Sequence, residues 1–379
     1  MNAGVEQILT LTFGKGGNET THLGNGWSGD EPGSRWMLGP GSEIWLEHPG
    51  QGHDLILELD IGGMDGPKGD GPKGDGPEGA APQRLVVGAR NRGIAQISVT
   101  QGGNLGFHIP AALIVEPGPV RLLFVHPDFR RPVDLGRGTD DRQLSFSARS
   151  LRLFRLLPRP APTPGPPLPF NQMIMGFESL GDNCEFGLVQ RQLQAEPLGL
   201  LRFSFIELPL LLRGLRSGFE GLGEPDTVEV NVVGQDREFV VRESVYGMTY
   251  HTFQYEAQMS LDAVRQQQAA RLSFLKQKLM RDIGAGEKIF VLKRSPALRP
   301  EEVLPVYATL NETARNWLLW MVPADAGHPA GSVEILLPGL MRGYIDRFAP
   351  LEDAHELSLR AWTAVCEAAW RAVGGALGG

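Results

Sequence analysis

Cys184 is the residue of this 379-residue chain whose type and neighbours best suit chemistry. Asp182 and Asn183 precede it as a turn and N-cap signature, and Glu185 begins a predicted helix. A thiol in the first turn of a helix lies at the positive end of the backbone dipole, which favours the thiolate and lowers its pKa. The pattern predicts a cysteine nucleophile, with backbone amides near Asn183 binding an oxyanion. The alternative is a buried thiol that packs as a small hydrophobic side chain, the role expected for Cys366.

A cysteine nucleophile commonly works with an imidazole base, and the C-terminal part of the chain offers three histidines. His251 lies among aromatic residues at the end of a predicted strand, His328 in a predicted loop, and His355 at the start of the last predicted helix. Spacing along the chain does not choose between them, because Cys and His partners meet in space.

Five segments of the C-terminal part resemble an uncharacterised bacterial family described as papain-like cysteine peptidases. They are Glu178-Ser-Leu-Gly-Asp-Asn-Cys184, Leu200-Leu-Arg-Phe-Ser-Phe205, Tyr250-His-Thr-Phe253, a helix with Arg271 to Lys278, and a strand Lys288 to Lys293. The resemblance covers roughly residues 175–345. It implies that Cys184 is the nucleophile and that His251 is the base.

The chain departs from that family's pattern at three places. Thr252 stands where the family has an aspartate after the histidine, and a hydroxyl is a weak substitute for a carboxylate that orients an imidazole. The segment from Phe203 to Ile206 lacks another aspartate of the pattern. Glu178 takes the position of a papain-like glutamine, and a carboxylate cannot donate to an oxyanion. The resemblance therefore implies a site that lacks some of its usual groups.

The elements that must position these residues divide the chain at a proline-rich segment, residues 158–169. Residues 1–157 show short apolar runs that alternate with polar residues between glycines and prolines, which predicts an antiparallel β-sandwich or jelly roll. Residues 170–379 alternate predicted strands with helices, which predicts an α/β layered domain. The strongest helix prediction is Ser260 to Ile283, with Ser260 as its cap. The whole is thus expected to be an α+β multidomain chain.

The N-terminal part is similar to β-sandwich modules attached to bacterial glycosyltransferases. Three stretches carry this resemblance: Gly24 to Trp36, the step Ile109-Pro110, and His126 to Gly136 with Asp140 to Arg142. Trp27 and Trp36 offer flat apolar faces for sugar rings; alternatively, both cover the core. A repeat from Gly66 to Gly79 has a five-residue period, not the three of collagen, and is expected to be a flexible hairpin insertion.

Bulk properties exclude some classes. A net charge of −8 and a pI near 5.6 argue against a nucleic-acid partner. No stretch of about 18 apolar residues predicts a membrane span, and the N-terminus shows no signal peptide. With only two cysteines, reduced thiols in the cytoplasm are the simpler expectation. No cofactor is expected, and no His/Cys cluster has the spacing of a metal site.

Two functions follow as hypotheses. The first is a cysteine-dependent hydrolase or acyltransferase that uses a Cys–His pair. The alternative is a non-catalytic accessory protein of bacterial polysaccharide biosynthesis, with a glycan or a glycosyltransferase as partner. The candidate catalytic residues are Cys184, His251 and Asn183, and the candidate substrate-binding residues are Asp182, Glu185, Arg202, Trp27 and Trp36.

Overall fold

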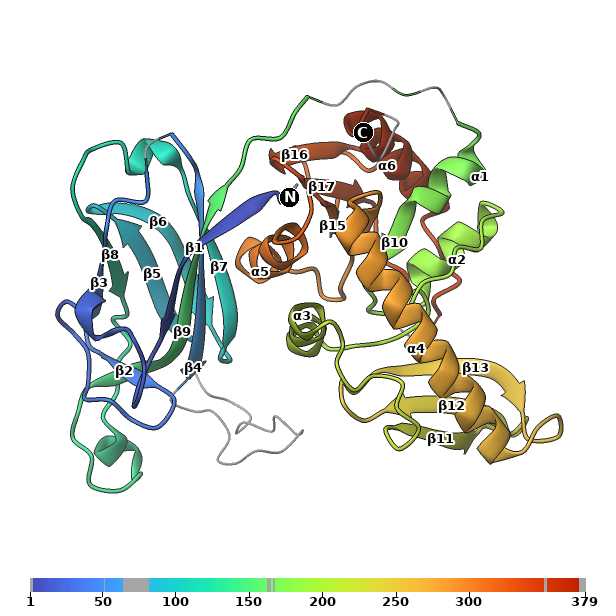
Figure 1. Ribbon diagram of the computed structural model, residues 1–379, viewed down its shortest axis with the longest axis horizontal. Helices are drawn as coiled ribbons and strands as arrows, with labels where there is room; N and C mark the ends of the chain where they lie inside the picture. The colour runs from blue at the N-terminus through green and yellow to red at the C-terminus, as the bar shows by residue number, and fades with distance from the viewer. Residues whose placement is uncertain are drawn as a thin grey trace. The chain divides into compact units, whose positions relative to one another are not determined.

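The computed structural model describes residues 3–50, 52–63, 82–161, 165, 168–350 and 353–374. The repeat from Gly66 to Gly79 and part of the proline-rich segment lie outside the described residues. The chain forms two compact units (Figure 1). The sandwich unit comprises Val5–Leu157 and Pro300–Ala308, and the C-terminal unit comprises Met1–Gly4, Pro158–Arg299 and Thr309–Gly379.

The sandwich unit is built from two antiparallel sheets. One has the order β1 (Val5–Thr12), β9 (Leu144–Leu156), β4 (Leu55–Gly63), β7 (Gly103–Ile109), with β2 (Arg35–Leu38) also paired to β9. The other has the order β3 (Gly41–Leu46), β8 (Val120–Val125), β5 (Gln83–Ala89), β6 (Arg92–Val99). Alternation along the strands places one set of side chains in the core between the sheets, as Val120, Leu122 and Phe124 of β8 show. The predicted sandwich is confirmed.

The C-terminal unit contains a five-stranded sheet with helices on both faces. Its order is β10 (Phe177–Ser179), β14 (Ile289–Leu292), β15 (Trp317–Pro323), β17 (Leu340–Ile345), β16 (Val333–Leu337); the first four strands are parallel and β16 is antiparallel. The core on one face joins the sheet to α1 (Phe170–Met173), α2 (Glu185–Gln192) and α6 (Leu359–Ala372). On the other face, Glu178 of β10 contacts Lys278 of α4 (Leu261–Ala285). The predicted layered α/β architecture is confirmed.

A smaller antiparallel sheet packs against α4 (Figure 1). It has the order β11 (Val228–Val233), β12 (Glu238–Glu243), β13 (Thr249–Tyr255). The remaining described helices are α3 (Leu208–Ser217), α5 (Pro300–Asn311) and the short 3-10 helices η1 (Thr20–His22), η2 (Ala111–Leu113), η3 (Pro132–Leu135) and η4 (Ile174–Gly176).

The predicted elements are found with shifted ends. The side chain of Ser260 accepts a hydrogen bond from the Ala263 amide, so the predicted cap of α4 is confirmed. The last helix begins at Leu359 instead of the expected His355, which lies in the preceding turn. The helix after the cysteine begins at Glu185, so Cys184 is its N-cap residue.

Candidate active site

Cys184 lies in the loop that follows the carboxyl end of β10 and leads into α2. The loop makes its turn with positive φ angles at Gly181 (88°) and Asp182 (108°), the second of which is costly for a residue with a Cβ. Asn183 Oδ1 accepts the Glu185 amide at 3.0 Å, which closes a turn that leads into the helix. The predicted turn is therefore found, and the N-cap position is occupied by Cys184 itself.

The thiol of Cys184 is partly buried, and its Sγ lies 3.8 Å from the Phe203 carbonyl oxygen, to which it donates. Burial raises the pKa of Cys184, and the charge of Arg191 only partly opposes this. The expected lowering by the helix dipole is thus wrong: desolvation of the thiolate outweighs the field of the short helix α2. At neutral pH the group is a thiol.

The residue before Cys184 has a side-chain donor without an acceptor in the described part of the chain. Asn183 Nδ2 is buried and makes no hydrogen bond with any described residue, although Oδ1 of the same amide is bonded. A buried unbonded N–H is costly, so such a group is a sign of a function or a ligand. The amide of Glu185, expected to help bind an oxyanion, is instead occupied by Asn183 Oδ1.

Asp182 and Glu185 belong to a buried ionic cluster at the carboxyl ends of β10 and β14. Lys293 Nζ lies 2.9 Å from Asp182 Oδ2 and 3.1 Å from Glu185 Oε2. Glu185 also accepts from the Trp362 indole at 2.9 Å, and Asp182 accepts from the Ser295 amide at 3.2 Å. With Glu185 fully buried and Lys293 only 3% exposed, both carboxylates hold the loop in place, and their predicted substrate contacts stay predictions.

Arg202 is also committed to the fold. Its guanidinium pairs with Glu196 at 2.6 Å and donates to the carbonyls of Gly187, Ala195 and Pro197. Burial lowers the pKa of Arg202, while Glu196 opposes that effect. The residue fastens the segment after α2, and the predicted substrate contact stays a prediction.

His251 is held by a carboxylate that sequence reasoning did not identify. Its Nδ1 lies 3.0 Å from Glu238 Oε2, and Glu238 Oε1 accepts the Phe253 amide at 2.9 Å. Thr252, at the position of the family's aspartate, donates its hydroxyl to the Phe239 carbonyl. Glu238 lies on the neighbouring strand β12, which pairs antiparallel with the strand of His251. The sequence signal that could have identified it is that two consecutive predicted strands pair and bring side chains on the same face together.

Cys184 and His251 are not bonded to each other, but Cys184 and the strand of His251 each contact the segment of residues 203–205. Within the described residues no hydrogen bond joins them. An isolated antiparallel bridge pairs Phe205 with Thr249. Phe205 lies two residues after Phe203, whose carbonyl accepts from Cys184, and Thr249 lies two residues before His251. The side chain of His251 is 57% exposed, and its Nε2 makes no hydrogen bond with the described chain.

The other two histidines have different surroundings. The imidazole of His328 stacks on Tyr344 with ring centroids 4.5 Å apart and pairs with Asp325 at 2.8 Å. His355 is exposed in the turn before α6. Of the three histidines, His251 has an orienting carboxylate and lies on the strand that is bridged to Phe205, two residues after the Phe203 carbonyl that accepts from Cys184.

The two candidate sugar-binding tryptophans, Trp27 and Trp36, each donate a hydrogen bond within the sandwich. Trp27 stacks on Phe13 with centroids 5.2 Å apart, packs against the core and donates to the Glu43 carbonyl. Trp36 donates its indole N–H to Glu31 at 3.0 Å. The contacts of Trp27 favour the alternative in which it covers the core, and the predicted sugar contact of Trp36 stays a prediction.

Among the described residues, no group of three or more His, Cys, Asp and Glu side chains is arranged to hold a metal ion. Nor is any described helix long and apolar enough to cross a membrane.

No family model and no curated protein matches the chain. Solved structures that resemble it include the C-terminal CBM6 of the laminarinase LamC from Zobellia galactanivorans, at 9% identity over 38% of this chain and 97% of that one, with a TM-score of 0.22. An acetyl xylan esterase, Est2A, from Butyrivibrio proteoclasticus matches at 10% identity over 99% of each chain, with a TM-score of 0.23. The salicylyl-acyltransferase SsfX3 of a tetracycline biosynthetic pathway matches at 8% identity over 98% of this chain and 97% of that one, with a TM-score of 0.20. TM-scores of this size do not establish a common fold.

Proposed function

We propose that the C-terminal unit is an acyl-transfer enzyme, a hydrolase or acyltransferase, with Cys184 as its nucleophile. The observation that carries the proposal is the unbonded Nδ2 of Asn183, the residue that directly precedes Cys184 in the chain. Its amide is fixed by the bond from Glu185 to Oδ1, so the free N–H group is already oriented. An oriented donor next to a nucleophile is what stabilises the oxyanion of a tetrahedral intermediate.

The reaction needs a general base, because the thiol of Cys184 is protonated at neutral pH. His251 Nε2 would accept the Sγ proton while sulfur bonds to the acyl carbon. The carbonyl oxygen would gain the electron pair and accept from Asn183 Nδ2. Collapse would break the bond to the leaving group, which takes the proton from His251 and leaves a thioester. Water or an acceptor hydroxyl would then attack the thioester.

Glu238 would act by fixing the imidazole of His251. Its bond to Nδ1 selects the tautomer that leaves Nε2 free as the base, and it stabilises the imidazolium that forms. His251 must approach Cys184 when substrate binds. Catalytic hydrogen bonds are often long or absent in a free enzyme and form only in the complex with substrate. The Phe205–Thr249 bridge supports this proposal, since it joins the strand of His251 to the segment whose Phe203 carbonyl accepts from the Cys184 thiol.

Acylation by p-nitrophenyl acetate tests the proposal. We expect nitrophenolate release and one added acetyl group, located by peptide mass spectrometry on Cys184. Cys184→Ala should abolish the adduct. Asn183→Ala should slow acylation by about 10²-fold, the typical cost of an oxyanion donor. Asn231→Ala, at an exposed position of β11, is the matched control and should leave the rate unchanged.

The base is tested separately. His251→Asn should slow acylation by about 10²-fold or more and should remove the dependence of the rate on an ionising base. Glu238→Gln should also slow it.

If Cys184 gains no acetyl group, or if its acylation is insensitive to Asn183 and His251, the acyl-transfer proposal fails. The non-catalytic alternative, an accessory protein that binds a glycan or a glycosyltransferase, would then remain.

A further inference from the structure

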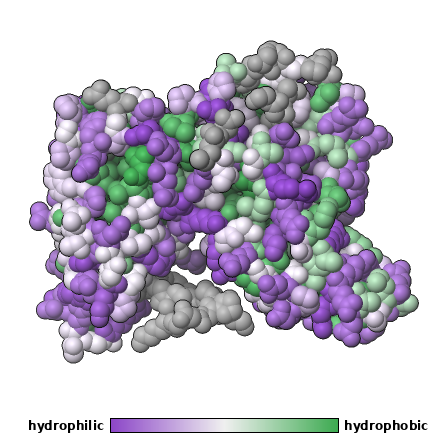
Figure 2. Space-filling view, in the orientation of Figure 1, coloured by the Kyte–Doolittle hydropathy of each residue, from purple (hydrophilic) through white to green (hydrophobic). Residues whose placement is uncertain are grey.

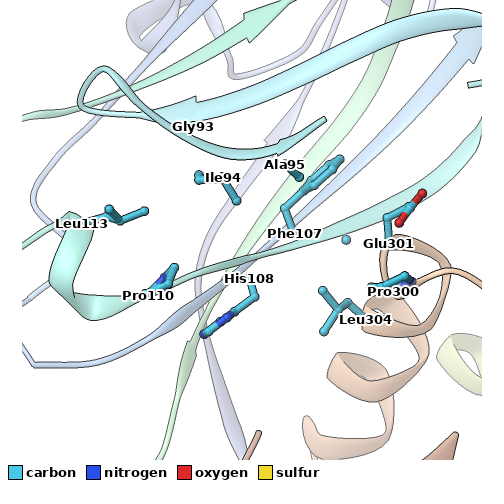
Figure 3. Close-up of a pocket in the computed structure, with 11 residues that line it drawn as sticks. Gly93, Ile94, Ala95, Phe107, His108, Pro110, Leu113, Pro300, Glu301 and Leu304 are labelled. Atoms are coloured by element: carbon cyan, nitrogen blue, oxygen red, sulfur yellow. The ribbon is translucent and has the colours of Figure 1, made fainter. Parts of the chain in front are cut away.

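A pocket of about 330 Å³ opens on the sandwich unit. None of the residues proposed for acyl transfer lines it. It is lined by residues of β6 (Gly93, Ile94, Ala95), β7 (Gly106, Phe107, His108), the segment after β7 (Pro110, Leu113) and the first turns of α5 (Pro300, Glu301, Leu304). Figure 3 shows Ile94 and Ala95 on one side and His108 and Leu304 on the other. Hydrophobic residues gather over β6 and β7 in the space-filling view (Figure 2).

One wall of the pocket is formed where α5 packs closely against β7 at Gly106. A Cβ at Gly106 would lie 2.5 Å from Leu304 Cβ and 2.8 Å from Pro305 Cδ, so only glycine lets α5 pack this tightly on β7. The helix therefore forms a fixed wall. Since all lining residues belong to the sandwich unit, the pocket is a property of that unit alone.

The two strands that line the pocket are edge strands. β6 is the last strand of one sheet and β7 the last strand of the other. On its outer side, the backbone of an edge strand has N–H and C=O groups without a strand partner. The pocket therefore combines apolar side chains with a row of backbone donors and acceptors.

An oriented imidazole adds a polar side chain. His108 Nε2 lies 2.8 Å from Asp54 Oδ2, and Asp54 Oδ1 accepts the Ala111 amide at 2.8 Å. The carboxylate therefore fixes the His108 ring, whose Nδ1 makes no hydrogen bond with the described chain. Glu301 contributes a buried carboxylate from the first turn of α5.

We infer that this pocket binds a single sugar ring. Its volume is at the small end of ligand sites, which suits one ring rather than a longer chain. A pyranose has an apolar face, which the partly exposed side chains of Ile94 and Leu113 can cover. It also has a rim of hydroxyl groups, which are both donors and acceptors and so match the edge-strand backbone and His108. A purely apolar ligand would leave those polar groups unpaired at a cost.

The test is binding of methyl glycosides of glucose, mannose, xylose and N-acetylglucosamine to the full chain, measured by calorimetry and by saturation-transfer NMR. Gly93→Leu should block the pocket, since Gly93 lines it and a Cβ there meets open space. Gly103→Leu, on β7 outside the pocket, also meets open space and is the matched control. Thermal melting of both variants checks that they fold.

We expect at least one glycoside to bind, with affinity reduced at least tenfold in Gly93→Leu and retained in Gly103→Leu and in Cys184→Ala. If Gly93→Leu does not fold, His108→Ala replaces it and should weaken binding by about tenfold through loss of one hydrogen bond. The inference is overturned if no glycoside binds the wild-type chain, or if binding survives in the blocked variant. Neither result bears on acyl transfer at Cys184, because the two sites share no residue.

Discussion

At Cys184 two physical effects act in opposite directions. The dipole of a helix favours a thiolate at its N-terminus by typically about 0.3–1 kcal/mol. Removal of the thiolate from water opposes it, and burial here raises the pKa. The nucleophile therefore depends on a base, which gives His251 and its carboxylate partner Glu238 their proposed importance.

We predict slow alkylation of Cys184 in the folded protein. With its pKa raised, the thiolate fraction near pH 7.5 is smaller than that of a free thiol, whose pKa is about 8.5. Iodoacetamide should thus react more slowly than with glutathione, and the rate should still rise above about pH 9. The same chain in urea is the control and should react like a free thiol. A rate that levels off below about pH 8 would contradict the expectation.

At the scale of elements, α2 is positioned by close contacts and by buried charge. A Cβ at Gly187 would lie 2.5 Å from the Phe203 ring and 2.6 Å from the Arg202 carbonyl oxygen, so the helix lies directly against the following segment. Lys293 of the segment after β14 links Asp182, before the helix, to Glu185, in its first turn. Both features fix the loop that carries Cys184.

Gly187→Ala should destabilise the protein by about 1–3 kcal/mol, because the added methyl group has no room. Alanine has a higher helix propensity than glycine, so a loss of stability on this substitution can be assigned to packing. Gly284→Ala in α4 is the control: its Cβ meets open space, and we expect about 0.5–1 kcal/mol of stabilisation. Urea unfolding measures both. Equal signs for the two variants would contradict the packing argument.

Lys293→Met should destabilise the protein by about 3 kcal/mol or more, since it leaves two buried carboxylates without their cation. Lys288→Met removes a lysine at the other end of the same strand, which donates to one exposed carbonyl, that of Met175, and should cost about 1 kcal/mol or less. Urea unfolding of the two variants is the measurement. A cost for Lys293→Met as small as that of the control would show that the cluster does not hold the loop.

At the scale of the whole molecule, the two units carry buried groups that titrate with opposite effects on stability. Burial lowers the pKa of His126 in the sandwich to about 4. The fold therefore favours neutral imidazole, and stability is lost as pH falls from about 6.5 to 4. Burial raises the pKa of Glu178 in the C-terminal unit to about 7, against the pull of Lys278. Here the fold favours the neutral carboxyl, and stability is lost as pH rises from about 4.5 to 7.

Hydrogen exchange, corrected for the intrinsic effect of pH, should resolve these two trends. Between about pH 7 and pH 5, peptides from β4 and β9 should lose protection while peptides from β14 and β15 gain it. Glu178→Gln is the control and should remove the gain in the C-terminal unit. The same gain in that variant would show that another group is responsible.

Local sequence patterns determined the fold class and the place of Cys184 at a helix start. The alternation of β8, the apolar stripe and Ser260 cap of α4, and the Asp-Asn turn before α2 depend on residues a few positions apart. The tertiary structure alone decided that Glu238 holds His251, that Lys293 pairs with Asp182 across 111 positions, and that the thiol is buried enough for its pKa to rise. The physical reason is that backbone conformation is set largely by near neighbours, whereas burial and charge partners arise only when distant segments pack together.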